Sequence, residues 1–271
     1  MKHVTRSFFG SAPRRAVCIV LLLAFAAATS WAEPVVITGS SGSLQATLRF
    51  EMVEGQLWIT LSNTSEADAL VPTDMLGGVF FDVANNPTLT PVWARVDTGS
   101  CLIYPTDAGC TSPAEVGPVY DNLNIGGEWN YNWLAFGSTS PVPTGQLQGI
   151  RAVGYADGLG SLGWSTLSPN IAGPDAVDGG NFSLAPRGDI PTTGNGGINN
   201  NDPYVRYSAV FAFDVPDGFA LGADTIRNVR FQYGTDFSGP WIPDVPEPAT
   251  LAMIGGGLIA LGFLRRRAAV R

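Results

Sequence analysis

Residues 44–62 read LQATLRFEMVEGQLWITLS, and this stretch decides the fold class. Along Leu44–Phe50 every second residue is apolar, which is the period of a strand with one buried face. After Glu54-Gly55 the alternation resumes over Gln56–Ser62, where Trp58 falls on the polar side. Two alternating runs joined by a Gly-containing pair predict a β-hairpin.

Strand signals continue on both sides of this hairpin, and helix signals are nearly absent up to residue 239. The runs are Val35–Thr38, Gly78–Val83, Leu89–Val96, Leu102–Tyr104, Glu128–Phe136, Leu147–Tyr155, Tyr204–Val215 and Ile226–Tyr233, the last with an irregularity near Asn228. Gly, Pro and Asn separate them and form turns, and residues 158–202 are loop-like. About ten short strands predict an all-β domain over residues 33–239, a single β-sandwich with a jelly-roll-like arrangement as one option.

The first 32 residues form a secretory signal. Lys2 and three arginines precede an apolar run, Ala16–Ala28. Ser30 and Ala32 supply the small residues of a signal-peptidase site. We therefore expect signal peptidase to remove residues 1–32 by cleavage after Ala32.

The C-terminal segment has three parts of different chemistry. A Pro-rich spacer, residues 240–250, favours an extended chain. Leu251–Leu264 is 14 uncharged residues, and as a helix it spans roughly 21 Å, against a bilayer core of about 30 Å. A basic tail, residues 265–271, then holds the C-terminus in the cytoplasm. So short and Gly-rich a transmembrane helix suits a transient anchor, and a weak permanent anchor is the alternative.

This tail resembles the PEP-CTERM sorting signal of Gram-negative bacteria that make extracellular polysaccharide. That signal consists of a Pro-Glu-Pro motif, a short apolar helix and a terminal Arg cluster, and all three occur here in order. The resemblance implies recognition by an exosortase, a membrane-embedded cysteine transpeptidase that cleaves near the motif. It assigns the sorting motif to Val245, Pro246, Glu247 and Pro248 and the membrane stop to Arg265, Arg266 and Arg267.

Several stretches of the domain are together similar to one family of exosortase-dependent surface proteins with such a tail. They are Gly78–Asp82, Leu89–Ala94, Gly127–Tyr131, Thr193–Gly197 and Val229–Thr235, in the family's order. The family has no known enzymatic activity. The resemblance therefore implies a location and carries over no catalytic residue.

Charge and composition exclude several function classes. Residues 33–245 contain seven Arg and 22 acidic residues, a formal net charge of about −15. This excess argues against nucleic acid as a partner, and against binding acidic polysaccharide by charge attraction alone. The only Lys and His, Lys2 and His3, lie in the signal, which excludes Ser–His or Cys–His catalysis, His zinc sites and Schiff-base chemistry. Carboxylate-pair chemistry stays open.

Cys101 and Cys110 are the only cysteines of the exported domain. An even number of cysteines in an exported chain predicts a disulfide, and two free thiols are the alternative. In the loop-entropy model a ring of about ten residues contributes on the order of 2–3 kcal/mol.

A Gly- and Asn-rich strip is a weak candidate for Ca²⁺. Asn195, Asn199 and Asp202 offer oxygen ligands of the kind that Ca²⁺ takes. Their spacing matches no ordered Ca²⁺ loop, and turn chemistry explains these residues equally well.

Trp129, Tyr131 and Trp133 share one face of an expected strand. Exposed rings in this arrangement would stack on sugars. Buried rings would belong to the core, which is the usual place for aromatic stripes in sandwiches. The glycan-contact interpretation requires at least two exposed rings.

The two terminal signals and the acidic, His-free domain favour a non-enzymatic exported surface or matrix protein. We expect it at the cell surface or in the exopolysaccharide matrix or biofilm of a Gram-negative bacterium. Its expected partners are signal peptidase, exosortase and exopolysaccharide, with no nucleic acid and no cofactor, Ca²⁺ being an option. The alternatives are a carbohydrate-binding module using surface aromatics and, more remotely, a carboxylate-dependent glycoside hydrolase.

Overall fold

The computed structural model describes residues 33–105, 109–110, 123–136, 145–152, 170–174, 182–198, 202–234 and 239–244, all in the unit Glu33–Arg271. Regular structure in this part of the chain is β-strand, apart from two short 3₁₀ helices, η1 (Pro72–Asp74) and η3 (Gly126–Glu128). The predicted all-β class is therefore confirmed. None of these residues forms a helix of the length and apolarity needed to span a bilayer.

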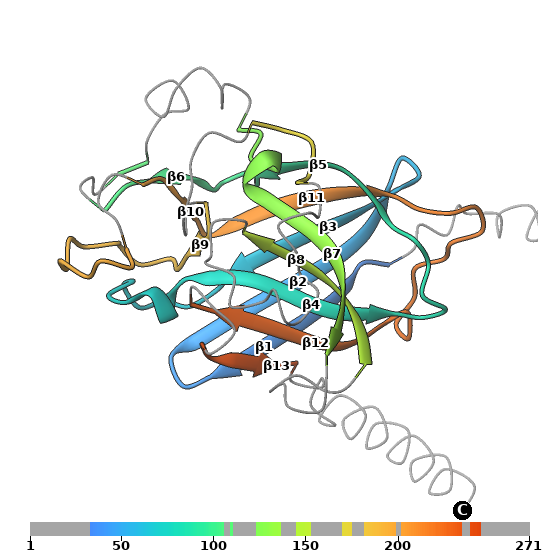
Figure 1. Ribbon diagram of the computed structural model, residues 1–271, viewed down its shortest axis with the longest axis horizontal. Coiled ribbons are helices and arrows are strands. Elements are labelled where there is room, and N and C mark those ends of the chain that lie inside the picture. Colours follow the sequence, from blue (N-terminus) through green and yellow to red (C-terminus); the bar gives the residue numbers. More distant parts are fainter. Residues whose placement is uncertain are drawn as a thin grey trace, which may run out of the picture. The chain divides into compact units, whose positions relative to one another are not determined.

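One sheet has five antiparallel strands in the order β1-β2-β3-β11-β5 (Figure 1). They are β1 (Val35–Ser41), β2 (Leu44–Val53), β3 (Gln56–Asn63), β5 (Thr90–Val96) and β11 (Ser208–Asp214). The predicted hairpin is β2–β3, with positive φ at both Glu54 and Gly55 of its two-residue turn. Such turns match the twist of the strands they join.

The second sheet has eight strands. Along one path they follow the order β13-β12-β4-β9-β10-β6, while β8 pairs with β4 and β7 with β8. Their bounds are β4 (Leu76–Val83), β6 (Cys101–Ile103), β7 (Trp129–Phe136), β8 (Gly145–Ala152), β9 (Leu184–Ala185), β10 (Tyr204–Arg206), β12 (Ile226–Tyr233) and β13 (Trp241–Pro243). In the described part of this sheet only β9 and β10 run parallel.

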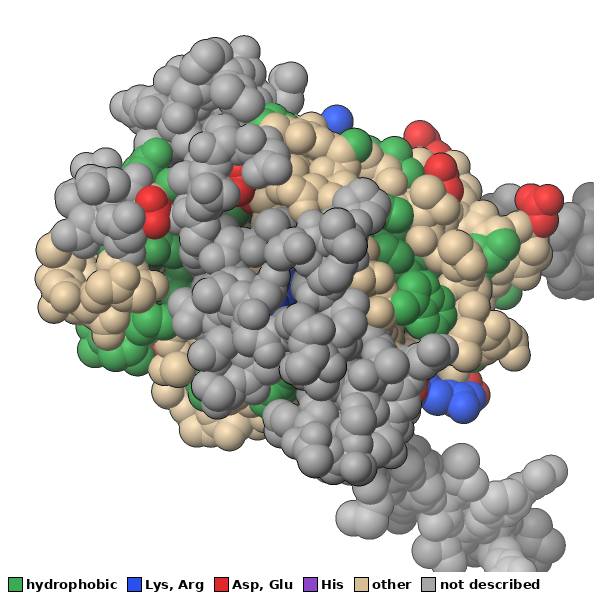
Figure 2. Space-filling model, viewed as in Figure 1, with side chains coloured by type: hydrophobic (Ala, Val, Ile, Leu, Met, Phe, Trp, Pro, Cys, Tyr) green, Lys and Arg blue, Asp and Glu red, His purple; other side chains and the backbone are tan. Residues whose placement is uncertain are grey.

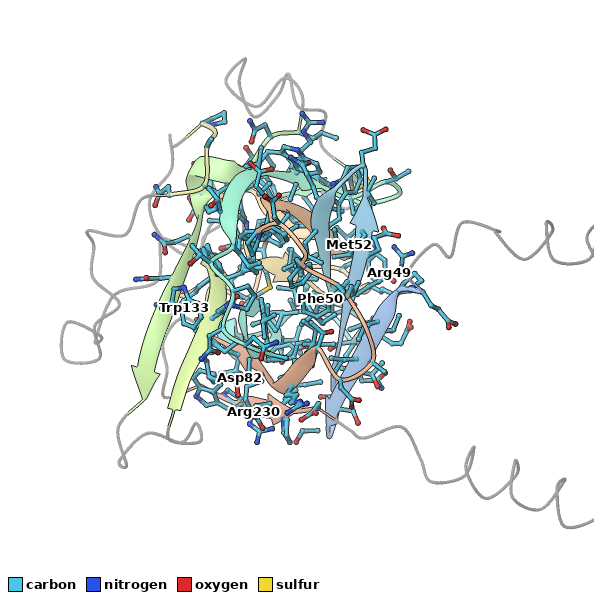
Figure 3. The ribbon with its side chains drawn as sticks, turned by 90° about the vertical axis from the view of Figure 1, so that its right-hand side faces the viewer. Arg49, Phe50, Met52, Asp82, Trp133 and Arg230 are labelled. Atoms are coloured by element: carbon cyan, nitrogen blue, oxygen red, sulfur yellow. A yellow bond between two sulfur atoms is a disulfide. The ribbon has the colours of Figure 1, made fainter. Side chains whose placement is uncertain are left out.

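Side chains from both sheets meet in one hydrophobic core. The ring of Phe50 on β2 lies edge to face against Phe81 on β4, with centroids 5.3 Å apart. In Figure 3, Phe50 lies between the sheets, while the neighbouring Arg49 points outward from β2. Phe50 is fully buried, as the alternation over Leu44–Phe50 predicts. The period of the sequence therefore places the core correctly in this sheet.

The predicted long strand Tyr204–Val215 is wrong as one element, because the chain changes sheets at Tyr207. β10 belongs to the eight-stranded sheet and β11 to the five-stranded one. Tyr207 has φ of +82°, donates its N–H to Ala185 beside β10 and accepts from Asn63 at the end of β3. A side chain at positive φ is sterically disfavoured, so this crossing point is a strained position.

The irregularity predicted near Asn228 is confirmed. Asn228 has φ of +52°, and the register of β12 against β4 shifts between Arg227 and Arg230. One extra residue on one strand is a β-bulge, and Asn tolerates the left-handed region better than most residues.

Two short strands lie where no strand was expected. β9 interrupts the loop-like stretch 158–202, and the described part of that stretch buries Phe182, Ile190 and Ile198. β13 pairs with β12 inside the expected Pro-rich spacer, so the sheet extends to Pro243.

Candidate functional site

Two of the three aromatic rings predicted on one strand belong to the core. Trp129 packs against Phe211 and Tyr131 against Phe213, each pair with centroids 4.9 Å apart, and both β7 rings are buried. Trp133, further along β7, is half-buried. The glycan-contact interpretation is therefore wrong for Trp129 and Tyr131, because β11 of the opposite sheet covers their faces.

A different aromatic pair lies on the outer face of the five-stranded sheet. Trp58 on β3 and Trp93 on β5 both stand opposite Ala212 of the strand between them, and their rings meet edge to face at 5.0 Å. The guanidinium of Arg95 lies 4.8 Å from the Trp93 ring centre. Both tryptophans are half-buried. The sequence carried a signal for Trp58, since it falls on the polar side of its strand.

The Ca²⁺ candidates are partly described. The Asn195 side-chain oxygen accepts the N–H of Gly197, and its backbone oxygen accepts that of Ile198, which is turn chemistry. Asn199 lies outside the described residues. No group of three metal-ligating side chains occurs within the described ranges. On the face shown in Figure 2 the visible acidic side chains lie at several separate places.

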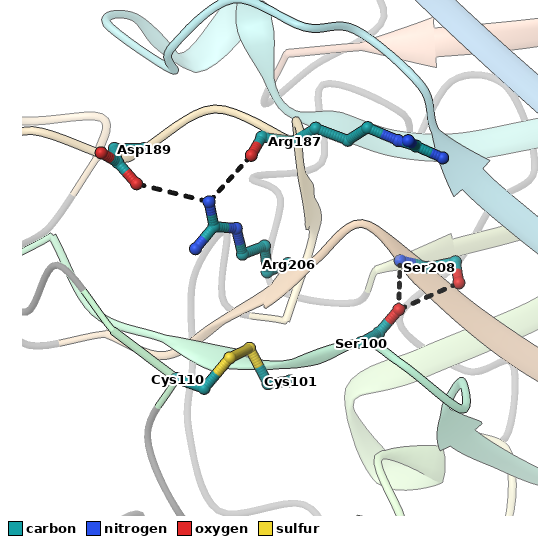
Figure 4. Close-up of a disulfide and its surroundings, with 7 residues drawn as sticks. All are labelled: Ser100, Cys101, Cys110, Arg187, Asp189, Arg206 and Ser208. Carbon is teal, nitrogen blue, oxygen red and sulfur yellow. Dashed lines mark hydrogen bonds and ion pairs between the residues drawn. A yellow bond between two sulfur atoms is a disulfide. The ribbon is translucent and has the colours of Figure 1, made fainter.

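The predicted disulfide between Cys101 and Cys110 is confirmed. It lies beside β10, where Cys101 pairs in register with Arg206 (Figure 4). A cavity of about 430 Å³ opens beside the disulfide, and Cys101, Cys110 and Arg206 are among the residues that line it. The bridge thus fixes one wall of a pocket that contains a basic side chain.

The described part of the domain ends at Asp244, which is held from two sides. Its N–H donates to the Val229 carbonyl on β12, and its carboxylate lies 3.3 Å from the Arg230 guanidinium. It also forms a β-bridge with Gly39 of β1. A cavity of about 660 Å³ at this corner is lined by both Glu33 and Asp244. The first and the last of the described residues therefore border the same cavity.

Residues 244–267 match the model of the PEP-CTERM protein-sorting motif. This match covers Val245–Pro248, the apolar run Leu251–Leu264 and the arginines 265–267, all outside the described residues. The resemblance seen in the sequence is thereby confirmed for the tail.

The PEP-CTERM motif is a sorting signal and indicates where the chain is transported. It marks exported proteins of Gram-negative bacteria for processing by an exosortase, so the chain is sorted to the surface or the extracellular space by this route. No curated protein and no solved structure matches the chain. The motif begins at Asp244, directly after β13, so the PEP-CTERM tail follows the folded domain without an intervening segment.

Proposed function

We propose that this protein is a non-enzymatic component of the exopolysaccharide matrix, released to it by exosortase processing. The observation that carries the proposal is the junction at Asp244, where the PEP-CTERM match begins one residue after the last strand. Cleavage near Pro246-Glu247-Pro248 would leave the whole domain on the outer side with almost no tail. The domain, and not a permanent anchor, would then determine where the protein resides.

Three finer features belong to the same proposal. Signal peptidase cleaves after Ala32, residues 33–243 form a β-sandwich, and Leu251–Leu264 spans the inner membrane until the exosortase acts. The shared core of the two sheets supports the sandwich. A non-enzymatic role is supported by composition, because residues 33–245 contain no His and no Lys.

Cell fractionation tests the matrix role. The producing strain is compared with a mutant that makes no exopolysaccharide and with one that lacks the exosortase. We expect the protein in the matrix of the parent, in the medium of the first mutant, and in the inner membrane of the second. If the protein stays on the cells when exopolysaccharide is absent, retention depends on something other than the matrix, and the proposal fails.

A carbohydrate-binding module is the second candidate, and the Trp58–Trp93 pair is the observation that favours it. The two rings are nearly perpendicular, at 82°, so at most one lies flat against a sugar. We expect Trp58→Ala or Trp93→Ala to lower sedimentation of the protein with purified exopolysaccharide. Trp133→Ala on the other sheet serves as the matched control. Equal sedimentation of all variants would remove this candidate.

A further inference from the structure

The corner at Asp244 contains an open sheet edge. β1 is an edge strand of the five-stranded sheet, and β2 pairs with one of its sides. On its other side it lies next to β13 (Figure 1), where the described residues form one β-bridge, between Gly39 and Asp244. The cavity of about 660 Å³ follows the rest of this edge, since Glu33–Thr38 all line it. The chain after Asp244 therefore starts at one end of a cavity bordered by β1.

Backbone groups of β1 point into this cavity. Gln45 of β2 stands opposite Ser40 and donates its N–H to Ser65, which follows β3, so this group points away from β1. Positions that bond to the neighbouring strand alternate with positions that do not in an antiparallel pair. Val36 and Thr38 follow Ser40 at steps of two, so their N–H and C=O groups also point away from β2. The edge thus offers donors and acceptors to a further strand.

The same edge carries apolar surface that is incompletely covered. Val35 and Ile37 pack against the core but are only half-buried. Their partners on β2, Phe50 and Leu48, are fully buried. Val36, on the opposite face of β1, is 46% exposed. A strand placed beside β1 would complete the burial of this apolar surface, which is favourable.

We propose that this edge binds the sorting motif Val245–Pro248 of the same chain, as an antiparallel strand, before the exosortase cleaves. The register follows from the bridge already present, because the motif continues from Asp244 along Val35–Thr38 in the opposite direction. Four residues of a strand extend about 13 Å, so the motif matches these four residues of β1 without a linker. Pro34 has no N–H, and the pairing ends before it.

The two prolines of the motif fall where this pairing needs no N–H. Asp244 donates its N–H to Val229 on β12, so this group points away from β1. The prolines follow Asp244 at steps of two and share this direction, whereas Val245 and Glu247 direct their N–H groups toward β1. Proline is found on strands at such positions. Because the prolines lack the donors that β12 would require, β12 cannot hold the motif as it holds β13.

The side chains of the motif fit the two faces of β1. Residues directly opposite one another in an antiparallel pair point to the same face. Pro246 then stands opposite Ile37 on the core side. Pro248 stands opposite Val35 on that side, so the two rings cover the half-buried side chains. The glutamate between them points to the outer face, where its carboxylate stays in water.

Docking holds the motif close to the membrane. Residues 249 and 250 alone separate the docked strand from the apolar run Leu251–Leu264. The exosortase therefore meets an extended motif fixed at the edge of the domain, while β1 shields one side of its backbone from soluble proteases. The proposal concerns the chain before processing and holds whether or not the processed domain resides in the matrix.

Disulfide trapping in the unprocessed full chain, purified in detergent micelles from a strain without exosortase, tests the docking. The test variant is Val36→Cys/Glu247→Cys and the control is Ser40→Cys/Glu247→Cys, since Val36 and Ser40 are exposed on the same face of β1. In the docked register position 247 faces position 36, within the range of about 4.4–6.8 Å between Cα atoms that a disulfide spans. A freely moving tail would reach Ser40 as readily as Val36, because Ser40 is next to Gly39 and its bridge to Asp244.

We expect the test pair to form a bridge within one chain at least about tenfold faster than the control pair, since in the docked register the control cysteines lie beyond the distance that a disulfide spans. Peptide mapping without reduction identifies the bonded cysteines, and the mass of the product separates bridges within a chain from bridges between chains. Equal rates for the two pairs, bridges between chains alone, or no bridge in either variant would overturn the proposal.

Amide hydrogen exchange gives a second readout without added cysteines. Glu247→Pro removes the N–H that faces β1 and should speed exchange at the Val36 and Thr38 amides about tenfold or more, because local opening then exposes them. Glu247→Gln keeps the N–H and should leave their exchange unchanged. The same exchange in both variants would contradict docking. These results concern the unprocessed chain, whereas the matrix role fails by location in the cell fractionation, so the two failures are distinguishable.

Discussion

Arg230 lies 3.3 Å from Asp244, and this contact joins β12 of the eight-stranded sheet to the first residue of the PEP-CTERM match. Asp244 also donates its N–H to Val229 and bridges to Gly39 on the other sheet. Asp244, the residue at which the domain ends and the tail begins, is thus bonded to both sheets. An enzyme that cleaves near Pro246-Glu247-Pro248 therefore acts a few residues after a position that the folded domain holds in place.

Gly39→Ala should destabilise this corner. A Cβ at Gly39 would lie 2.7 Å from the buried Phe231 ring and 2.9 Å from the Pro243 carbonyl, distances that real Cβ atoms do not show. We expect a loss of about 1–3 kcal/mol in the free energy of unfolding, measured by urea denaturation. Gly196→Ala is the control, because nothing lies within 4 Å of its added Cβ. Equal stability of the two variants would mean that the corner has room to adjust.

The two kinds of tryptophan should differ in their contribution to stability. Trp129→Ala removes a fully buried ring and should cost about 3–5 kcal/mol. Trp58→Ala removes a half-buried ring and mainly its edge-to-face contact with Trp93, a pair worth about 0.5–1.5 kcal/mol beyond area burial. Urea denaturation of both variants measures the difference. An equal or larger cost for Trp58 would show that the outer face is as tightly packed as the core.

Alkaline pH should unfold the domain through two tyrosines. Burial raises the pKa of Tyr131 and of Tyr233 well above the ordinary value, while the hydrogen bond between Tyr131 and the Leu89 backbone, and those between Tyr233 and both Ser65 and the Gln45 backbone, lower these pKa values by less. Because the folded pKa values are raised, this stabilisation is complete below about pH 10, the unfolded pKa, and is lost as pH rises toward the folded values.

Denaturation midpoints measured from pH 8 to pH 11 check this. The double variant Tyr131→Phe/Tyr233→Phe should lose part of the slope above pH 10, by up to about 1.4 kcal/mol per pH unit for each tyrosine. It should also be less stable at pH 8, since Tyr131 donates a hydrogen bond to Gln148. An unchanged slope in the double variant would assign the alkaline loss to other groups.

Loss of the disulfide should weaken the fold moderately. Cys101→Ser/Cys110→Ser opens a ring with a sequence separation of 9 and should cost about 2–3 kcal/mol in the loop-entropy model. Dithiothreitol should lower the urea midpoint of the natural protein by the same amount and leave the double variant unchanged. A shift of the double variant by dithiothreitol would mean that the reagent acts on something other than this bridge.

The sequence predicted the elements with a clear period and missed those without one. The β2–β3 hairpin follows from the alternation over residues 44–62, because one face of each strand must be buried. β9 and β13 are two and three residues long, too short for any periodicity. The sheet change at Tyr207 was also invisible, since the side-chain alternation continues through it while the hydrogen-bonding partners change.

The candidate sites were predictable to different degrees. The Cys101–Cys110 pair followed from counting cysteines in an exported chain, and the PEP-CTERM tail from its three parts in order. The position of Arg206 beside this disulfide depends on the pairing of β6 with β10, which no local pattern indicates. The burial of Trp129 was left open by the sequence, because the strand that covers it lies far away in the chain.

Intact-mass measurement of the exported protein tests the central claim most directly. The protein is purified from the producing strain and from an otherwise identical strain without exosortase. We expect the parent strain to yield a chain without residues 1–32 and ending near Pro246-Glu247-Pro248, and the mutant to yield a chain that still contains Leu251–Arg271. A parent-strain protein that retains Leu251–Arg271 would contradict exosortase processing.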